Sequence, residues 1–151
     1  MSTRSHVASI ELDAPPDRAF AALVTPSAIR AWWSAARAIV DAREGGIWSA
    51  AWGDDEDAPE YITTARILAA DAPRRLVLGE YAYFARSGPL PFAADFTTEF
   101  VVEPHDGGSR LTVRQDGFPA DAVADAFYEG CERGWRDTLA SLAAFLARSN
   151  G

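Results

Sequence analysis

Cysteine is almost absent from this chain of 151 residues, which contains only Cys131. A single cysteine excludes an internal disulfide and any metal site built from several thiolates. The two histidines, His6 and His105, fall in a predicted first strand and a predicted hairpin turn, and no HExxH motif or Cys/His cluster is present. The acidic run at 54–57 lacks the spacing of a calcium-binding loop. We therefore predict no metal and no cofactor.

Positive charge is also scarce, with 14 Lys and Arg against 22 Asp and Glu and a net charge of -8. Without a basic cluster, binding to nucleic acid phosphates or anionic lipid is disfavoured. No apolar run is long enough to span a bilayer, and the N-terminus lacks the apolar segment of a signal peptide. We expect a cytoplasmic protein with no nucleic acid or membrane partner, and its oligomeric state stays open.

Signatures of common catalytic and nucleotide-binding sites are missing as well. The chain has no glycine loop of the phosphate-binding kind and no GxSxG motif. What is present is a composition with 48% hydrophobic and 11% aromatic residues, which is typical of a globular protein with a packed core. The length fits one domain, so we predict that residues 1–151 form a single domain.

The order of predicted elements indicates an α+β fold. A strand at 6–12 is followed by two short helices at 15–23 and 26–33, each opened by proline. Residues 36–117 alternate strands and turns, and the last segment, 121–148, has the apolar spacing of one helix. At 1.5 Å per residue this helix is about 42 Å long, so it must lie across a whole sheet.

A curved antiparallel sheet and a long straight helix meet at the ends and leave a cavity between them. The candidate walls of this cavity are aromatic residues that repeat toward one side of their strand or helix, although at least half of such residues are expected to be ordinary core. They are Trp48, Trp52, Phe96, Phe100, Phe118, Tyr128 and Trp135.

Glu80 and Gln115 are polar residues on faces that alternation predicts to point inward. A carboxylate inside the cavity would be protonated or paired, and would suit a general acid or base, or recognition of an amine or hydroxyl. The alternative is that Glu80 lies in water near the strand end or pairs with Arg86 or Arg114. By the same alternation Tyr81 and Tyr83 point outward unless a bulge intervenes.

The long helix contains two glycines, Gly130 and Gly134, each costing about 1 kcal/mol relative to alanine. We expect them to thin the helix where a strand or a ligand approaches. Cys131, on the apolar stripe of the same helix, is expected to be a small buried side chain that lines the cavity rather than a reactive thiol. The loop 85–94, with Gly88 and an exposed Phe92, is the candidate for a mobile gate.

Several segments together carry a family resemblance that covers nearly the whole chain. They are "APPDRAFAALVTPSAIRAWW", "EGGIW", "APRRLVL", the hairpin "FVVEPHDGGSRLTVRQDGF" and the helix motif "GW" followed by Leu139 and Leu142. The chain resembles the START-related helix-grip (SRPBCC) superfamily, and within it the homologues of the C-terminal domain of the heat-shock-protein-90 ATPase activator. The resemblance implies a curved sheet of about seven strands wrapped on the C-terminal helix, with a hydrophobic cavity between them. Where such proteins often carry an aromatic residue, this chain has Glu80.

Three functions follow as hypotheses. The first is binding of a small apolar or aromatic molecule in the cavity, with no reaction catalysed. The second is a polyketide cyclase or dehydratase-like enzyme, in which Glu80 is the candidate, though a weak one, for the acid or base. The third, implied by the resemblance, is a co-chaperone-like module of the stress response that stimulates a chaperone ATPase. An exposed apolar patch on the convex face or along the loop 85–94 would favour this third function.

Overall fold

The computed structural model describes residues 2–55, 57–90, 92 and 95–148. Strand β1 (Thr3–Leu12) leads into helices α1 (Pro16–Val24) and α2 (Pro26–Trp32). The remaining strands are β2 (Arg37–Val40), β3 (Ile47–Trp52), β4 (Tyr61–Asp71), β5 (Arg75–Ala85), β6 (Thr97–His105) and β7 (Gly108–Pro119). A short 3-10 helix, η1 (Ala122–Ala124), precedes the long helix α3 (Asp125–Arg148). This order confirms the predicted α+β helix-grip fold.

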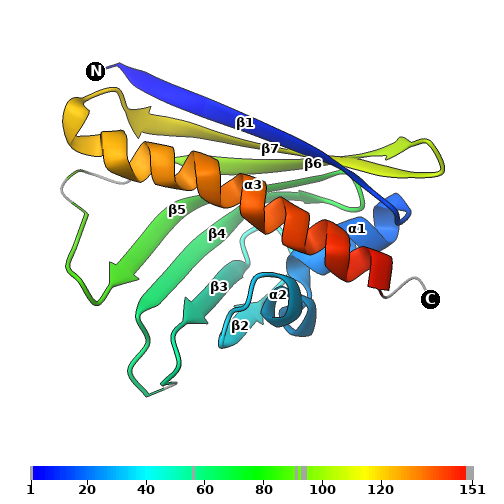
Figure 1. Cartoon of the computed structure of the whole chain (residues 1–151), viewed down its shortest axis with the longest axis horizontal. Helices are drawn as coiled ribbons and strands as arrows, with labels where there is room; N and C mark the ends of the chain where they lie inside the picture. The colour runs from blue at the N-terminus through cyan, green and yellow to red at the C-terminus, as the bar shows by residue number, and fades with distance from the viewer. Residues whose placement is uncertain (1, 56, 91, 93–94, 149–151) are drawn as a thin grey trace.

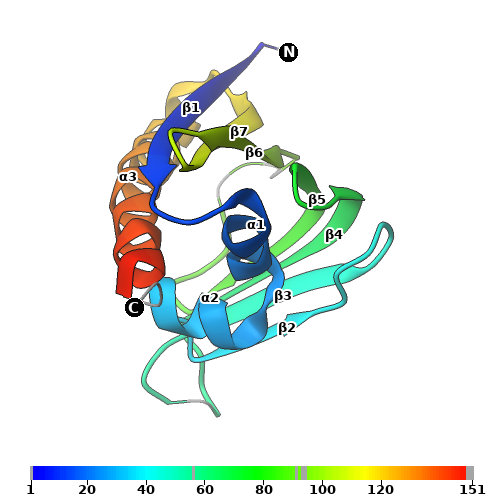
Figure 2. The same ribbon diagram turned by 90° about the vertical axis from the view of Figure 1, so that its right-hand side faces the viewer.

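The strands form one antiparallel sheet in the order β1-β7-β6-β5-β4-β3-β2. Figure 1 shows α3 crossing the sheet, and Figure 2 shows the sheet curving from β1 round to β2 with the helices on its concave side. Helix α3 packs mainly on β1 and on α2. Within the described residues, none of the helices has the length and apolar character needed to cross a membrane.

Prolines define the two short helices. Pro16 lies in the first turn of α1, where its missing N–H is not needed. Thr25 ends α1 by donating its backbone N–H to the carbonyl of Ala21, at 3.0 Å, and its extended backbone then leads into Pro26, the first residue of α2. The chain therefore turns sharply between α1 and α2, which directs α2 toward α3 and closes one end of the sheet's concave side.

The core fills the two ends of the concave side. At one end Leu139, Leu142 and Leu146 of α3 are buried together with residues of α1 and α2. At the other end Phe118 is fully buried, and its ring meets that of Tyr128 edge to face at 5.4 Å. Between these ends α3 is only partly buried at Phe127 and Cys131. The helix therefore stands off the middle of the sheet.

A β-bulge interrupts the alternation of β5. Arg66 pairs with Gly79 and Thr64 pairs with Ala82, so two residues of β5, Glu80 and Tyr81, lie opposite one residue of β4. Glu80 takes a left-handed conformation with φ of 49°. The extra residue moves every later side chain of β5 to the opposite face. The register shifts at two further places, between Ile67 and Ala69 of β4 and in β7, where the bulge includes Gly117 at φ of 93°.

The structure contradicts the role predicted for the helix glycines. Gly130 and Gly134 are exposed, and a Cβ atom placed on either would meet no atom within 4 Å. The helix turns these glycines toward solvent because its apolar stripe, through Cys131, Trp135 and Leu139, lies on the other side. Neither a strand nor the cavity approaches them.

Gly130→Ala and Gly134→Ala should each stabilise the protein by about 1 kcal/mol, because alanine has the higher helix propensity and the space is empty. Urea unfolding followed by circular dichroism measures the change. Gly117→Ala is the matched control and should destabilise, since its Cβ would lie 2.5 Å from the Asp95 carbonyl oxygen. A loss of stability in the two helix variants would show that another part of the protein packs against this face of α3.

Candidate functional site

A cavity of about 210 Å³ lies between the middle of α3 and the concave side of the sheet. Its walls come from the residue that follows α2, from α3 and from strands β3 to β7, and they are mainly aromatic. The lining residues are Trp33, Trp48, Trp52, Thr63, Leu78, Tyr81, Tyr83, Phe96, Phe100, Gln115, Phe127, Cys131 and Trp135.

All five tryptophans of the chain gather at one end of this cavity, around Trp33. The ring of Trp33 stacks on Trp32 at 5.1 Å, and Trp48, Trp52 and Trp135 lie within 5.5 Å of it, centroid to centroid. Such tilted and stacked pairs contribute about 0.5–1.5 kcal/mol each beyond the burial of their surface. The cluster is therefore a rigid wall.

Hydrogen bonds from the indole rings to helix carbonyls hold three of these side chains. Trp32 donates to Ala22 O at 2.8 Å, and Trp48 donates to Leu23 O at 3.0 Å, both at the end of α1. Trp52 donates to the carbonyl of Trp33 at 3.0 Å. The acceptors are carbonyls at helix C-termini, which lack partners within the helix. The N–H groups of these three rings therefore have hydrogen-bond acceptors, and these acceptors lie behind the cavity wall.

The opposite end of the cavity carries a chain of buried polar side chains. His6 Nε2 lies 2.7 Å from Gln115 Oε1, and Gln115 Nε2 lies 2.9 Å from Thr98 Oγ1. Thr98 Oγ1 is in turn 2.7 Å from the hydroxyl of Tyr81. Of these residues, Gln115 and Tyr81 line the cavity. The chain therefore brings two polar side chains, Gln115 and Tyr81, to the cavity lining, while His6 and Thr98 lie behind it.

The titratable groups that line the cavity are neutral near pH 7. Burial raises the pKa of the Cys131 thiol to about 11. Burial also raises the pKa of Tyr81, against a smaller opposing effect of its hydrogen bond with Thr98, and it raises the pKa of Tyr83. Behind the wall, burial lowers the pKa of His6, although the hydrogen bond with Gln115 acts in the other direction. The cavity is aromatic and uncharged.

The structure brings most of the predicted wall residues to the cavity. Those that line it are Trp48, Trp52, Phe96, Phe100, Gln115, Cys131 and Trp135. Phe118 and Tyr128 lie behind the lining instead. Phe118 stacks on the outer side of Phe96 at 5.0 Å, and Tyr128 donates its hydroxyl proton to the carbonyl of Ser5 at 2.7 Å.

The prediction that Glu80 faces the cavity is wrong. Its side chain is exposed on the opposite side of the sheet, because the bulge at Glu80 and Tyr81 reverses the alternation that places Leu76 and Leu78 inside. Neither arginine considered as its partner contacts it. Arg86 donates to the carbonyl of Pro59, and Arg114 pairs with Asp116.

The same bulge brings in residues that alternation had placed outside. Tyr81 and Tyr83 line the cavity, and Tyr81 packs against Phe96 at 4.9 Å. The sequence signal was the pair "GE" at Gly79 and Glu80, because a glycine within a strand marks a bulge or a close approach. Trp33, the centre of the tryptophan cluster, was missed because the pair "WW" ends a helix and periodicity says nothing about a capping residue.

A second, outer hollow of about 650 Å³ borders the cavity at Tyr83 and Phe127. The loop predicted to be a gate lines it with Ala85, residues 87–90 and Phe92. Phe92 is half-buried rather than exposed, since its ring meets that of Phe127 at 5.5 Å. The remaining loop residues, 91, 93 and 94, lie outside the described residues, and the gate stays a prediction.

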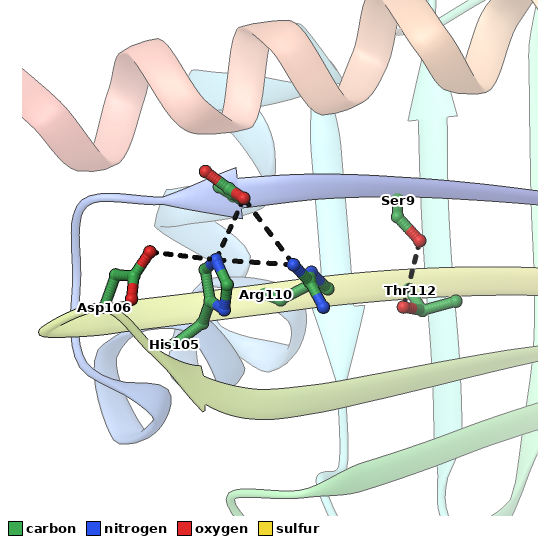
Figure 3. Close-up of polar contacts among 6 residues, drawn as sticks. Ser9, His105, Asp106, Arg110 and Thr112 are labelled. Atoms are coloured by element: carbon green, nitrogen blue, oxygen red, sulfur yellow. Dashed lines mark hydrogen bonds and ion pairs between the residues drawn. The ribbon is translucent and has the colours of Figure 1, made fainter.

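The outer surface over β1 and β7 is polar. Figure 3 shows His105 between Asp106 and Arg110, with Ser9 and Thr112 paired further along the strands at 3.1 Å. His105 Nε2 also lies 2.9 Å from a carboxylate oxygen of Glu11. Such exposed pairs contribute at most about 1 kcal/mol each, so their main effect is to keep this face hydrated. Among the residues that the structure describes, no group of three or more His, Cys, Asp or Glu side chains is arranged to hold a metal ion.

Fold and cavity together define a helix-grip protein with an aromatic interior. The chain belongs to the family described as Activator of Hsp90 ATPase homolog 1-like protein, whose sequence profile matches residues 13–147. No curated protein matches the chain.

Solved structures with the same fold come from several bacteria. Protein MLL2253 from Mesorhizobium loti has a TM-score of 0.76 and 21% identity, over 96% of this chain and 98% of that one. Protein CV1439 from Chromobacterium violaceum has a TM-score of 0.72 and 25% identity, over 94% and 96%. DynU16, a protein from the dynemicin biosynthetic locus, has a TM-score of 0.71 and 16% identity, over 95% of this chain and 47% of that one.

The thiol of Cys131 should react slowly. With a pKa raised from 9.0 to about 11, its thiolate fraction at pH 8 is about 100-fold below that of an ordinary cysteine. Alkylation by iodoacetamide, followed by mass spectrometry, should be slower by at least this factor in the folded protein than in the same protein unfolded in urea. The folded rate should keep rising with pH up to about pH 11. Equal rates in the two states at pH 8 would show that the thiol is not buried as described.

Proposed function

We propose that the protein binds a small apolar molecule with one or two aromatic rings in the cavity beneath α3. The observation that carries this proposal is an aromatic cavity that the protein's own side chains leave unfilled. Protein interiors are otherwise packed as densely as organic crystals, so an unfilled space of this size needs a reason.

The size of the cavity limits the ligand. An engineered apolar cavity of about 150 Å³ is enough for benzene, whereas sites for drug-sized ligands begin at about 300 Å³. At about 210 Å³, the cavity fits a molecule between these limits. A ligand with three or more fused rings would require α3 or the strands to move.

The chemistry of the cavity walls also favours a small aromatic ligand. Aromatic rings offer flat faces and edges, and ring pairs are most favourable when offset or edge to face. Trp33, Trp52 and Phe100 present rings at several inclinations around the space. A neutral interior penalises a charged ligand, because no side chain among the described lining residues carries an opposite charge to compensate for lost hydration. The geometry therefore favours a neutral aromatic guest.

An enzyme of the cyclase or dehydratase kind is less well supported. Such a reaction needs an acid or base that gains or loses a proton near neutral pH. Among the described residues that line the cavity, the titratable ones are Tyr81, Tyr83 and Cys131, and burial raises the pKa of each. Glu80, the predicted acid or base, lies outside the cavity.

A co-chaperone-like role is the second candidate, because the family is named for homology to an activator of the Hsp90 ATPase. Within the described residues, the outer face over β1, β6 and β7 carries an exposed Val7 beside ion pairs such as Glu99 with Arg75 of the neighbouring β5 at 2.6 Å. More exposed apolar side chains lie on the other strands, at Ile39, Leu68 and Phe84. A contact with a chaperone would fit that part of the sheet better.

Indane, a neutral two-ring hydrocarbon, tests the proposal. Binding should shift the indole N–H signals of Trp33 and Trp52 in an NMR titration, because both rings line the cavity. Cys131→Phe, which fills the cavity from α3, should weaken binding by more than about tenfold at a cost of about 1–3 kcal/mol in stability. Arg133→Phe, on the exposed side of the same helix, is the control and should bind indane like the wild type.

Two outcomes would refute ligand binding in the cavity. One is the absence of any change in the tryptophan signals up to the solubility limit of indane. The other is equal weakening by Cys131→Phe and Arg133→Phe, which would place indane on the surface of α3.

Glu80→Gln tests whether Glu80 lies outside the cavity, which the sequence did not predict. Because Glu80 is exposed on the far side of the sheet, this change should leave the protein's affinity for indane unchanged within about twofold. The same holds for 1-indanone, the ketone with the same two rings. Isothermal titration calorimetry of the two proteins makes the comparison. A large loss of affinity would mean that the bulge rearranges and that Glu80 enters the cavity.

A further inference from the structure

The buried polar chain has a direction that can be worked out atom by atom. Gln115 Oε1 can only accept, so His6 must donate its Nε2 proton across the 2.7 Å contact. Gln115 then donates through Nε2 to Thr98 Oγ1 at 2.9 Å. Thr98 is fully buried, and within the described residues its hydroxyl contacts only Gln115 and Tyr81.

Since Thr98 already accepts from Gln115, its own proton is satisfied only by donation to Tyr81. The 2.7 Å contact between the two hydroxyl oxygens therefore runs from Thr98 to Tyr81. This leaves the hydroxyl proton of Tyr81 without an acceptor among the described residues, on a side chain that lines the cavity. Every step of the chain points from His6 toward the cavity.

The opposite direction is less favourable. If the Gln115 amide were turned over, it would donate to His6 Nε2, and the histidine proton would move to Nδ1. His6 Nδ1 is buried without a partner. A buried N–H with no acceptor is rarer in proteins than a buried acceptor with no donor, so the first direction is preferred. Protonation of His6 would not reverse it, because Nε2 donates in both forms.

From this arrangement we propose that the Tyr81 hydroxyl is the hydrogen-bond donor to the ligand, and that the ligand is an aromatic or alicyclic compound bearing a neutral oxygen acceptor such as a ketone. The inference rests on the proposed function, since it concerns the same cavity. The rings of the ligand contact the tryptophan cluster, and its carbonyl oxygen meets Tyr81 at the polar end. Burial keeps Tyr81 protonated and able to donate at any physiological pH.

Indane and 1-indanone test this inference, because they share a ring system and differ by one carbonyl group. A net hydrogen bond to a neutral acceptor is worth about 5- to 10-fold in affinity, so 1-indanone should bind that much more tightly than indane. In Tyr81→Phe the ratio of the affinity for 1-indanone to that for indane should fall to one or below, because the buried carbonyl then lacks its donor. Calorimetric titration measures all four affinities, and circular dichroism shows that the variant is folded.

Tyr83→Phe is the matched control, since it removes the other tyrosine hydroxyl lining the cavity and lies outside the polar chain. It should keep the preference for 1-indanone. Equal affinity of the wild type for both compounds would refute the donor role of Tyr81 and leave cavity binding intact. Loss of the preference in Tyr83→Phe alone would place the donor at Tyr83 and also refute the inference. If neither compound binds, the proposed function itself fails.

Discussion

The mismatch between a straight helix and a curved sheet governs this structure. Helix α3 contacts the sheet through its leucines at one end, and the ring cluster around Phe118 closes the other end. Strand twist prevents the sheet from following a straight axis between these points. Only side chains long enough to bridge the gap could remove the space, and Cys131, at the middle of the helix, is too short to do so. The cavity is therefore a consequence of the architecture and of a small residue at one position.

The bulge in β5 then determines the chemistry of that cavity. With regular alternation Glu80 would point inward, and the interior would contain a carboxylate that must be paired or protonated. One extra residue exchanges it for Tyr81 and Tyr83, which remain neutral. A strained left-handed backbone at Glu80 accompanies this exchange. The titratable residues of the described cavity lining, Tyr81, Tyr83 and Cys131, thus stay protonated near neutral pH.

The sequence predicts the elements well, because prolines, turn residues and apolar periodicity act locally. It also predicts the inward faces of β3, β6 and β7, where alternation is unbroken over the cavity-lining residues Trp48, Phe100 and Gln115. It fails at Glu80, because Gly79 signals a bulge or a close approach without saying which, and the bulge itself is set by pairing with β4. It fails at Gly130 and Gly134 because glycine in a helix does not reveal which neighbour, if any, it accommodates. Trp33 was missed because its position is set by where α2 ends.

A cluster of five tryptophans could have collapsed into the space and closed it. The structure shows why it does not. The rings of Trp32, Trp48 and Trp52 are tied by their N–H groups to carbonyls behind the wall, and a ring that moved inward would break that hydrogen bond. Leaving a buried donor unpaired costs about 1–3 kcal/mol, more than a single ring contact returns. The hydrogen bonds at the helix ends therefore keep the aromatic wall in place and the cavity open.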